Sequence, residues 1–331
     1  MTTISQTASR GCKELLEATR AFVPESRARS WWYVLSTSVA LASLVALAAQ
    51  PIFWPLRLGL SALAGLVSVR MFILYHDYLH GALLRGSKAA RLILYPFALW
   101  VMTPPKVWRE THNYHHNHTA KLVGSSIGSF ATMSLESYAQ ATAVEKFRYR
   151  LVRHPLTVVF GYFTIFMLDM CLMSFLRSPR KRWDSLVALL LNWAIAAVVI
   201  PRFGFATWLF AAFLPIFIAT GIGAYLFYAQ HNFDGLHIQP RDVWSYDRAA
   251  LESSSYMVTG PLLAWFTGNI GYHHVHHLNP TIPFYRLPEA MAAIPELQNA
   301  SKTSLAPGEI VACFKLKLWD PEQQKMVGYP A

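Results

Sequence analysis

Long apolar runs separated by short polar turns dominate the pattern along this chain. A helix needs about 20 apolar residues to cross the hydrocarbon core of a bilayer, and four runs approach or exceed that length. Trp31, Trp32 and Tyr33 open the first run, and aromatic side chains at such a position anchor a helix at the membrane surface. The pattern therefore predicts an all-α integral membrane protein with transmembrane helices at about residues 31–50, 55–75, 185–200 and 205–229.

Two further apolar segments fit a membrane crossing less well. Residues 92–102 have half the needed length and end at Pro104 and Pro105. Residues 155–176 are long enough, but Asp169 interrupts them. A group of cations follows, here named the basic cluster: Arg177, Arg180, Lys181 and Arg182. We predict that both segments associate with the membrane without crossing it.

The composition agrees with a membrane protein. Hydrophobic residues make up 54% of the chain and charged residues 14%, against roughly 25% charged residues in a soluble chain. The formal net charge of +11 is typical of cytoplasmic loops that meet anionic lipid, and it also suits an acidic protein partner. Nucleic acid is excluded as a partner, since no basic run is interleaved with stacking aromatic residues. Cys12, Cys171 and Cys313 form no C-x-x-C motif, which excludes a disulfide framework and a zinc–thiolate site.

Histidines gather in three clusters, which we call boxes. Positions i and i+4 share one helix face, so the two histidines of the first box can bind one metal. In each H-x-x-H-H box we expect the first and second histidines to share a face, and the third to reach a neighbouring metal. The boxes are His76 and His80, then His112, His115 and His116, then His273, His276 and His277, while His231 lies alone at the end of the last apolar run.

Eight clustered imidazoles exceed the needs of one ion, because four-coordinate zinc takes three or four ligands. The clusters therefore predict two metals, and imidazole suits iron, copper, nickel or zinc. Without thiolates nearby, we favour redox-active iron. Asp77, Asp234 and Asn269 are either partners that orient the ligand imidazoles or ordinary capping and surface residues. We interpret four other histidines as surface or capping residues, the last of them also a possible partner of the third box: His118, His154, His237 and His274.

The boxes can share metals only if they lie on one side of the membrane. Between the second and third boxes the number of crossings must therefore be even, and residues 185–200 and 205–229 supply two. Residues 155–176 must then lie in the interface or re-enter. The basic cluster agrees, because Arg and Lys collect in cytoplasmic loops. Residues 1–30 lack the features of a signal peptide, so we predict that both termini and all boxes are cytoplasmic.

The chain resembles the membrane fatty acid desaturases over about residues 31–290. The similarity rests on the H-D-x-x-H form of residues 76–80 and on W-F-T-G-N-I-G-Y at 265–272, which leads into the third box. It continues through L-N-P-T-I-P-F-Y-R-L at 278–287. Within that family the chain is most similar to bacterial and cyanobacterial acyl-lipid desaturases of the delta-12 or omega-6 type.

This resemblance implies a di-iron centre held by the eight box histidines and His231, in a helical cytoplasmic cap, with no catalytic residue beyond the metal ligands. It also implies dioxygen as the oxidant and a separate electron donor such as ferredoxin. Some relatives carry Asn four residues before the extra histidine, where this chain has Phe227, which leaves the last ligand of one iron open. Fused cytochrome domains carry His-Pro-Gly-Gly, but His154 and Pro155 are followed by Leu156, which predicts that none is fused.

The implied organisation is a cytoplasmic segment 1–30, a desaturase domain 31–290 and a cytoplasmic tail 291–331. The implied reaction places a cis double bond in a long, lipid-linked acyl chain. A carotenoid or alkyl hydroxylase or ketolase is the alternative, because it uses the same boxes to insert oxygen. A metal transporter would place histidines within the apolar runs, whereas the boxes lie at their polar ends. The position of the double bond and the carrier of the acyl chain stay open.

Overall fold

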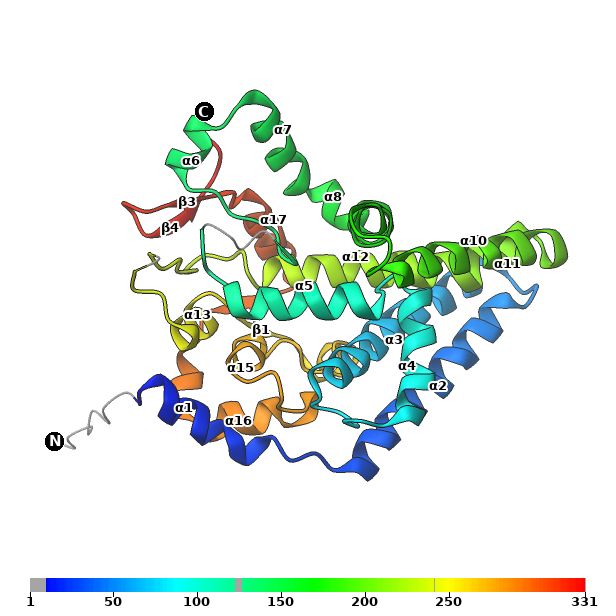
Figure 1. Ribbon diagram of the computed structural model, residues 1–331. Coiled ribbons are helices and arrows are strands. Elements are labelled where there is room, and N and C mark those ends of the chain that lie inside the picture. Colours follow the sequence, from blue (N-terminus) through cyan, green and yellow to red (C-terminus); the bar gives the residue numbers. More distant parts are fainter. Residues whose placement is uncertain (1–9, 123–126, 241, 331) are drawn as a thin grey trace.

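The computed structural model describes residues 10–122, 127–240 and 242–330, and helices make up most of it (Figure 1). Four helices are long and apolar enough to cross a membrane by length and composition. This finding confirms the predicted all-α membrane fold. The four are α2 (Arg27–Ala49), α3 (Trp54–His80), α10 (Trp183–Phe203) and the continuous helix Phe205–Ala229, which comprises α11 (Phe205–Trp208), η3 (Leu209–Phe213) and α12 (Leu214–Ala229).

The end of α3 differs from the pattern of apolar residues. The apolar run ends at Tyr75, but the helix continues to His80, where Gly81 takes the left-handed conformation (φ 74°) that ends many helices. The helix continues because the backbone N–H and C=O groups of the additional turn make helical hydrogen bonds, and because this turn packs inside the protein. The first histidine box therefore lies on a candidate membrane-spanning helix itself.

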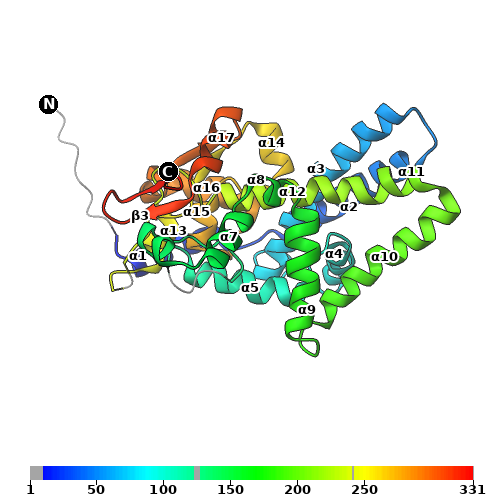
Figure 2. The ribbon, with the colours of Figure 1, turned by 90° about the horizontal axis from the view of Figure 1, so that it is seen from above.

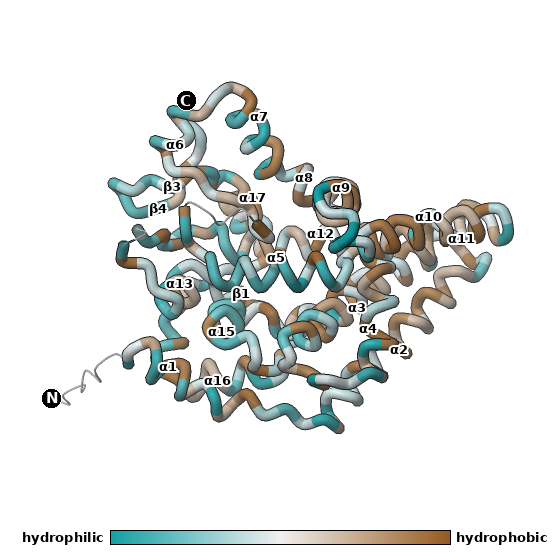
Figure 3. The backbone as a smooth tube through the Cα atoms, in the orientation of Figure 1, coloured by the Kyte–Doolittle hydropathy of each residue, from teal (hydrophilic) through white to brown (hydrophobic). Residues whose placement is uncertain are grey.

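The long helices pack around α3. Helix α3 contacts both α2 and α12, and a Cβ added at Gly65 would lie 2.8 Å from Ile218 of α12, so the missing side chain allows this close approach. The hydrophobic residues concentrate on these helices, while the opposite end of the molecule is mainly hydrophilic (Figure 3). That hydrophilic end is the cap. Its helices are α1 (Cys12–Thr19), α5 (Pro105–His118), α13 (Tyr246–Glu252), α14 (Pro261–Phe266), α15 (His273–Leu278), α16 (Leu287–Ala293) and α17 (Pro307–Lys315).

Residues 155–177 form a separate helical segment that crosses the long helices. It comprises α8 (Pro155–Val159), η2 (Tyr162–Met173, with π-helical hydrogen bonds) and α9 (Ser174–Arg177). It is seen end-on in Figure 1 and lengthwise in Figure 2, so the two views together show that it runs steeply across α12. Such an orientation fits the predicted interfacial segment, whose placement in a membrane stays a prediction. The other short segment, α4 (Lys88–Trp100), has 13 residues.

Short elements complete the cap. Strand β1 (Tyr256–Val258) pairs in parallel with β2 (Lys302–Ser304), and β3 (Leu318–Asp320) pairs antiparallel with β4 (Lys325–Val327). The β1–β2 pair joins residues from both sides of position 290, so the predicted tail packs onto the preceding chain. The remaining elements are α6 (Leu135–Gln140), α7 (Ala143–Val152), and the 3-10 turns η1 (Arg20–Phe22), η4 (Phe284–Arg286) and η5 (Pro295–Asn299).

Candidate metal centre

Four elements carry the box histidines and His231 to one place. The last turns of α3 carry the first box, α5 the second and α15 the third, while His231 follows the end of α12. The start of α5 is fixed because the Asp184 carboxylate of α10 accepts a hydrogen bond from the backbone N–H of Lys106 at 2.7 Å. All nine side chains predicted from the sequence thus meet where the long helices join the cap.

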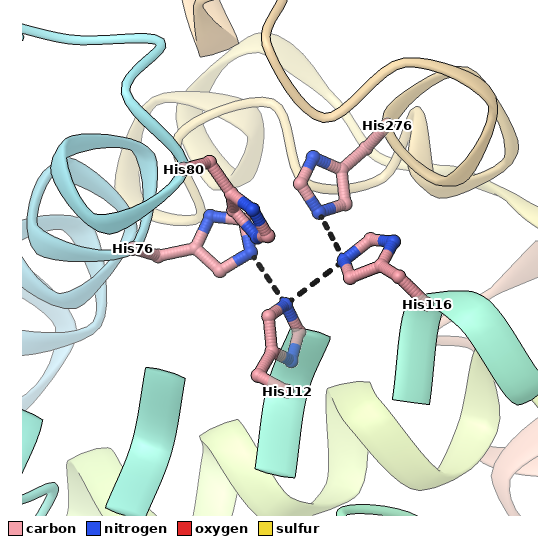
Figure 4. A group of neighbouring side chains, drawn as sticks. All are labelled: His76, His80, His112, His116 and His276. Atoms are coloured by element: carbon pink, nitrogen blue, oxygen red, sulfur yellow. Dashed lines mark hydrogen bonds between the residues drawn. The ribbon is translucent and has the colours of Figure 1, made fainter. Parts of the chain in front are cut away.

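Five of them form what we call the five-histidine group: His76, His80, His112, His116 and His276. One ligand nitrogen from each lies within 4.8 Å of all the others. The Nε2 atom of His112 lies 3.0 Å from Nε2 of both His76 and His116, and Nε2 of His276 lies 3.1 Å from that of His116. In Figure 4 the rings point toward one another from α3, α5 and α15.

The other four form the four-histidine group: His115, His231, His273 and His277. Nε2 of His231 lies 2.9 Å from that of His273 and 3.1 Å from that of His115. Nε2 of His277 lies 3.1 Å from that of His273. The two groups are neighbours, because the rings of His116 and His277 stack with their centroids 4.3 Å apart.

The division of each H-x-x-H-H box differs from the prediction. The first and third histidines share a group, and the second belongs to the other group. An i, i+4 pair is offset by about 40° around a helix and an i, i+3 pair by about 60°, so the former aligns better on one point. The expectation that the first and second residues share a metal was therefore wrong. The middle member of each box belongs to the group that contains the outer members of the other box. His115 lies with His273 and His277, and His276 lies with His112 and His116.

The proton positions in these groups favour a bound cation. Nδ1 of His231 lies 3.0 Å from the Ser253 carbonyl oxygen, which only accepts, so Nδ1 holds the proton and Nε2 presents a lone pair. That lone pair faces two other ring nitrogens at about hydrogen-bond distance, and a neutral imidazole has a single N–H to offer. The buried Nδ1 atoms of His116, His273 and His276 also have no hydrogen-bond partner among the described residues. Converging lone pairs repel one another unless a metal ion lies between them.

Burial also keeps these imidazoles neutral, the form that binds metals. Desolvation lowers the pKa of His231 to about 4. In the cap, desolvation first and neighbouring histidines second hold the pKa of six further side chains well below its ordinary value: His112, His115, His116, His273, His276 and His277. The geometry and the donor set thus both fit metal ions of the kind that nitrogen ligands bind.

Comparison with known proteins identifies the family. Residues 51–306 match the sequence model of the family described as fatty acid desaturase. The chain belongs to this family. A protein named fatty acid desaturase from Bacillus subtilis is 29% identical over 98% of this chain and 93% of that protein. An sn-1 oleoyl-lipid 12-desaturase from Synechocystis is 23% identical over 68% of this chain and 64% of its own length. An sn-1 acyl-lipid omega-3 desaturase (ferredoxin) from Synechocystis is 24% identical over 80% of this chain and 75% of its own length.

The chain is therefore an oxidoreductase of the desaturase kind. One of the three suggested orienting residues contacts an imidazole of this desaturase. The Asp77 carboxylate lies 3.0 Å from Nδ1 of His76 through Oδ1, and its Oδ2 accepts the Phe284 N–H at 2.7 Å. Asn269 instead donates to the Phe284 carbonyl at 3.2 Å, and Asp234 is exposed.

The other four histidines lie outside both groups, as the sequence suggested, but His274 is not a surface residue. His274 is buried, but its Nε2 donates to the Leu297 carbonyl at 2.9 Å and so supports the cap. His154 caps α8 by accepting the Leu156 N–H, and Nδ1 of His118 donates to the Tyr114 carbonyl. His237 is exposed.

Two aromatic residues were not predicted as part of the site. Trp108 stacks on His112 with ring centroids 4.1 Å apart, and it lies one helical turn before that histidine on α5, a spacing that could have pointed to it. Phe227 stands where some relatives have Asn, and its ring lies 4.8 Å from that of His115 and 5.5 Å from that of His231. The four-histidine group therefore contacts the apolar ring of Phe227 at the position where an Asn side chain could have supplied a further ligand.

A cavity of about 720 Å³ adjoins the histidines of the desaturase. A volume of this size lies within the range of small-ligand sites. His76, His112 and His273 line one part of it, and apolar side chains line most of the rest, among them Phe72, Ile73, Val101, Trp108, Phe166, Met170, Leu226 and Phe227. Arg177 and Arg182 of the basic cluster line another part. The cavity thus links the histidine groups to a charged surface.

Proposed function

We propose that this desaturase introduces a cis double bond into a long, lipid-linked acyl chain, with dioxygen as the oxidant and two irons held by the nine histidines. One observation carries the proposal: two adjacent groups of buried, neutral imidazoles border one largely apolar cavity. The five-histidine group would hold one iron and the four-histidine group the other. An iron pair supplies the power to remove hydrogen from an unactivated methylene, which no side chain can do.

The protein's own part is to bind and orient. The apolar side chains of the cavity remove an acyl chain from water, which contributes about 0.8 kcal/mol for each buried methylene group. Asp77 fixes the ring of His76 through its Nδ1 proton, so that Nε2 faces the centre of the five-histidine group. The Ser253 carbonyl does the same for His231. Trp108 and Phe227 cover rings of the two groups and keep water from that side.

We assign the substrate to an acyl chain that is already monounsaturated, and the reaction to the delta-12 or omega-6 type. The stretch around the third box supports this assignment, as do relatives named sn-1 oleoyl-lipid 12-desaturase. A separate acidic electron carrier such as ferredoxin would supply the electrons. The net charge of +11 and the relative named with ferredoxin support such a donor.

The protein is proposed to cross the membrane four times, with the termini and the histidine boxes in the cytoplasm. Helix α1, strands β3 and β4, and all three boxes lie at the same end of the long helices, as an even number of crossings requires (Figure 1). Reporter fusions at each terminus and within residues 177–183 test the orientation. Cytoplasmic signals at all three positions are expected, and an external signal from the basic cluster would refute the topology.

The reaction is tested by expressing the chain with ferredoxin and its reductase in a host whose lipids carry oleoyl chains. Mass spectrometry of the fatty acids should reveal a species lighter than oleate by two hydrogens. The variant His116→Ala, which removes a ligand from the five-histidine group, is the negative control. A product heavier by one oxygen, with no gain of double bonds, would contradict desaturation.

A further inference from the structure

One part of the cavity has a polar and charged lining, unlike the rest. Its wall is mainly aromatic and aliphatic, but η2, α9 and the turn before α10 contribute Asp169, Ser174, Arg177 and Arg182. Within this wall, Nη1 of Arg182 donates to the Ser174 hydroxyl at 3.1 Å, and the Arg182 side chain is 18% exposed. A hydrophilic patch at α9 beside the apolar α10 is visible in Figure 3. We call this end of the cavity the arginine mouth.

The neighbouring residues give the depth of the arginine mouth in a membrane. Arg182 directly precedes α10, a candidate spanning helix, whose first residue Trp183 is 52% exposed. The Lys106 ammonium lies 4.7 Å from the centre of the Trp183 ring. A Trp at the start of a spanning helix marks the level of the lipid headgroups, and a neighbouring Lys from α5 fits the same level. In the proposed topology, the arginine mouth therefore lies at the depth of the lipid phosphates.

The segment that forms the cavity wall also has an exposed apolar face. The η2–α9 segment lines the cavity with Phe166 and Met170, and on its other side it exposes Phe163, Leu168 and Leu172. An apolar face of this kind is stable in contact with acyl chains, because water does not wet it there. A lipid of the adjoining leaflet can thus present its headgroup to the arginine mouth and its acyl chain to the cavity.

The carboxylates near the two arginines are weak competitors for them. Arg182 Nη2 lies 3.3 Å from Glu110, and Arg177 Nη1 lies 3.5 Å from Asp169. Both carboxylates are exposed, by 62% and 66%, so water screens their attraction for the two arginines. Arg180 and Lys181 add two further cations to the same turn, so its charge stays positive. A phosphate can therefore displace either carboxylate.

We propose that Arg182, assisted by Arg177, binds the phosphate of a phospholipid whose acyl chain occupies the cavity. The guanidinium fork matches phosphate oxygens in two parallel hydrogen bonds, which ammonium groups cannot do. The depth of the mouth favours a headgroup phosphate over that of a soluble carrier. This inference rests on the proposed function, and it makes Arg182 a residue that determines specificity by the headgroup of the substrate.

The test compares substrates that share oleoyl chains and differ in the carrier. Purified enzyme is assayed on dioleoyl phosphatidylglycerol, on the uncharged dioleoyl monogalactosyldiacylglycerol and on oleoyl-coenzyme A. The variant Arg182→Gln should raise KM for phosphatidylglycerol roughly tenfold, the size of one hydrogen bond to a charged group, and should leave KM for the galactolipid within about twofold. Arg182→Lys should restore part of the loss.

Two matched controls separate binding from folding. Arg180→Gln removes the same charge from the same turn, but Arg180 is exposed and is not among the cavity residues, so KM should not change. Glu110→Gln removes the ion pair of Arg182 and leaves its guanidinium in place, so KM for phosphatidylglycerol should stay equal or fall. If Arg182 acted only by holding α5 through Glu110, this variant would instead reproduce the defect of Arg182→Gln.

Each remaining outcome is decisive. Equal losses on phosphatidylglycerol and galactolipid, or turnover of oleoyl-coenzyme A alone, would overturn the phospholipid assignment while leaving the desaturase activity intact. Absence of a new double bond with any of the three substrates would instead count against the proposed function. Native mass spectrometry of detergent-solubilised protein gives a readout without turnover, since Arg182→Gln should retain less phosphatidylglycerol than Arg180→Gln.

Discussion

The contact between Asp77 and His76 gives the sharpest test of the proposed metal centre. In Asp77→Asn the Phe284 N–H remains a donor, so the amide oxygen must face it and the amide NH₂ must face His76. Nδ1 of His76 then has to accept, and its proton moves to Nε2, which points at Nε2 of His112 from 3.0 Å. The substitution therefore turns a ligand lone pair into an N–H without changing the size of the side chain.

The expected magnitude follows from this change of tautomer. Loss of a carboxylate that orients a metal-bound histidine lowers metal affinity by roughly 10–100-fold, which corresponds to about 1.4–2.8 kcal/mol. Only the five-histidine group should be affected, because Asp77 contacts none of the other four histidines. Iron content measured by elemental analysis during titration with a chelator should show one iron lost early and one retained as in the wild type.

The matched control is Asn269→Gly. The Asn269 side chain also hydrogen-bonds to Phe284, because it donates to the Phe284 carbonyl. The backbone φ of Asn269 is 54°, a conformation that glycine adopts readily. This variant removes a partly buried hydrogen bond beside the site without changing any contact of an imidazole, so both irons should resist the chelator as in the wild type. Equal iron binding by Asp77→Asn and the wild type, or early loss of iron from Asn269→Gly, would refute the reasoning.

Three further predictions follow from single contacts. His231→Ala leaves three imidazoles in its group, so iron per chain should fall toward about half of the wild-type value in elemental analysis, and full retention would contradict the four-histidine group. Gly221→Ala places a Cβ 2.8 Å from a backbone oxygen of α8 and should cost about 1–3 kcal/mol in thermal unfolding, whereas Gly223→Ala, with open space, should be neutral or stabilising. The Arg10 guanidinium lowers the pKa of Glu296 to about 2. The ion pair between these residues, which holds the start of α1, should therefore be intact above about pH 4.5 and lost as the pH falls toward 2. Hydrogen exchange of α1 should follow this window in the wild type, and Glu296→Gln should abolish the dependence.

Much of the architecture was determined by the sequence alone. The thickness of a bilayer fixes the length of an apolar run, so the four long helices were predictable from local composition. The histidine boxes were predictable because spacing on a helix is also a local property. The count of crossings between the histidine boxes, together with Asp169 and the basic cluster, predicts that residues 155–176 do not span the membrane, and this placement stays a prediction.

Tertiary structure alone decided how those parts meet. His76, His112 and His276 belong to three helices far apart in the sequence, so their grouping depends on how α3, α5 and α15 approach one another. The division of each H-x-x-H-H box was predicted wrongly. Spacing shows which residues share a helix face, but it does not show which side chains of other helices lie opposite that face. The role of Asp77 likewise required Phe284, more than two hundred residues away, to hold its second oxygen. The cavity that joins the histidines to Arg182 is lined in part by η2 and α12, which pack against each other, and no local pattern records that contact.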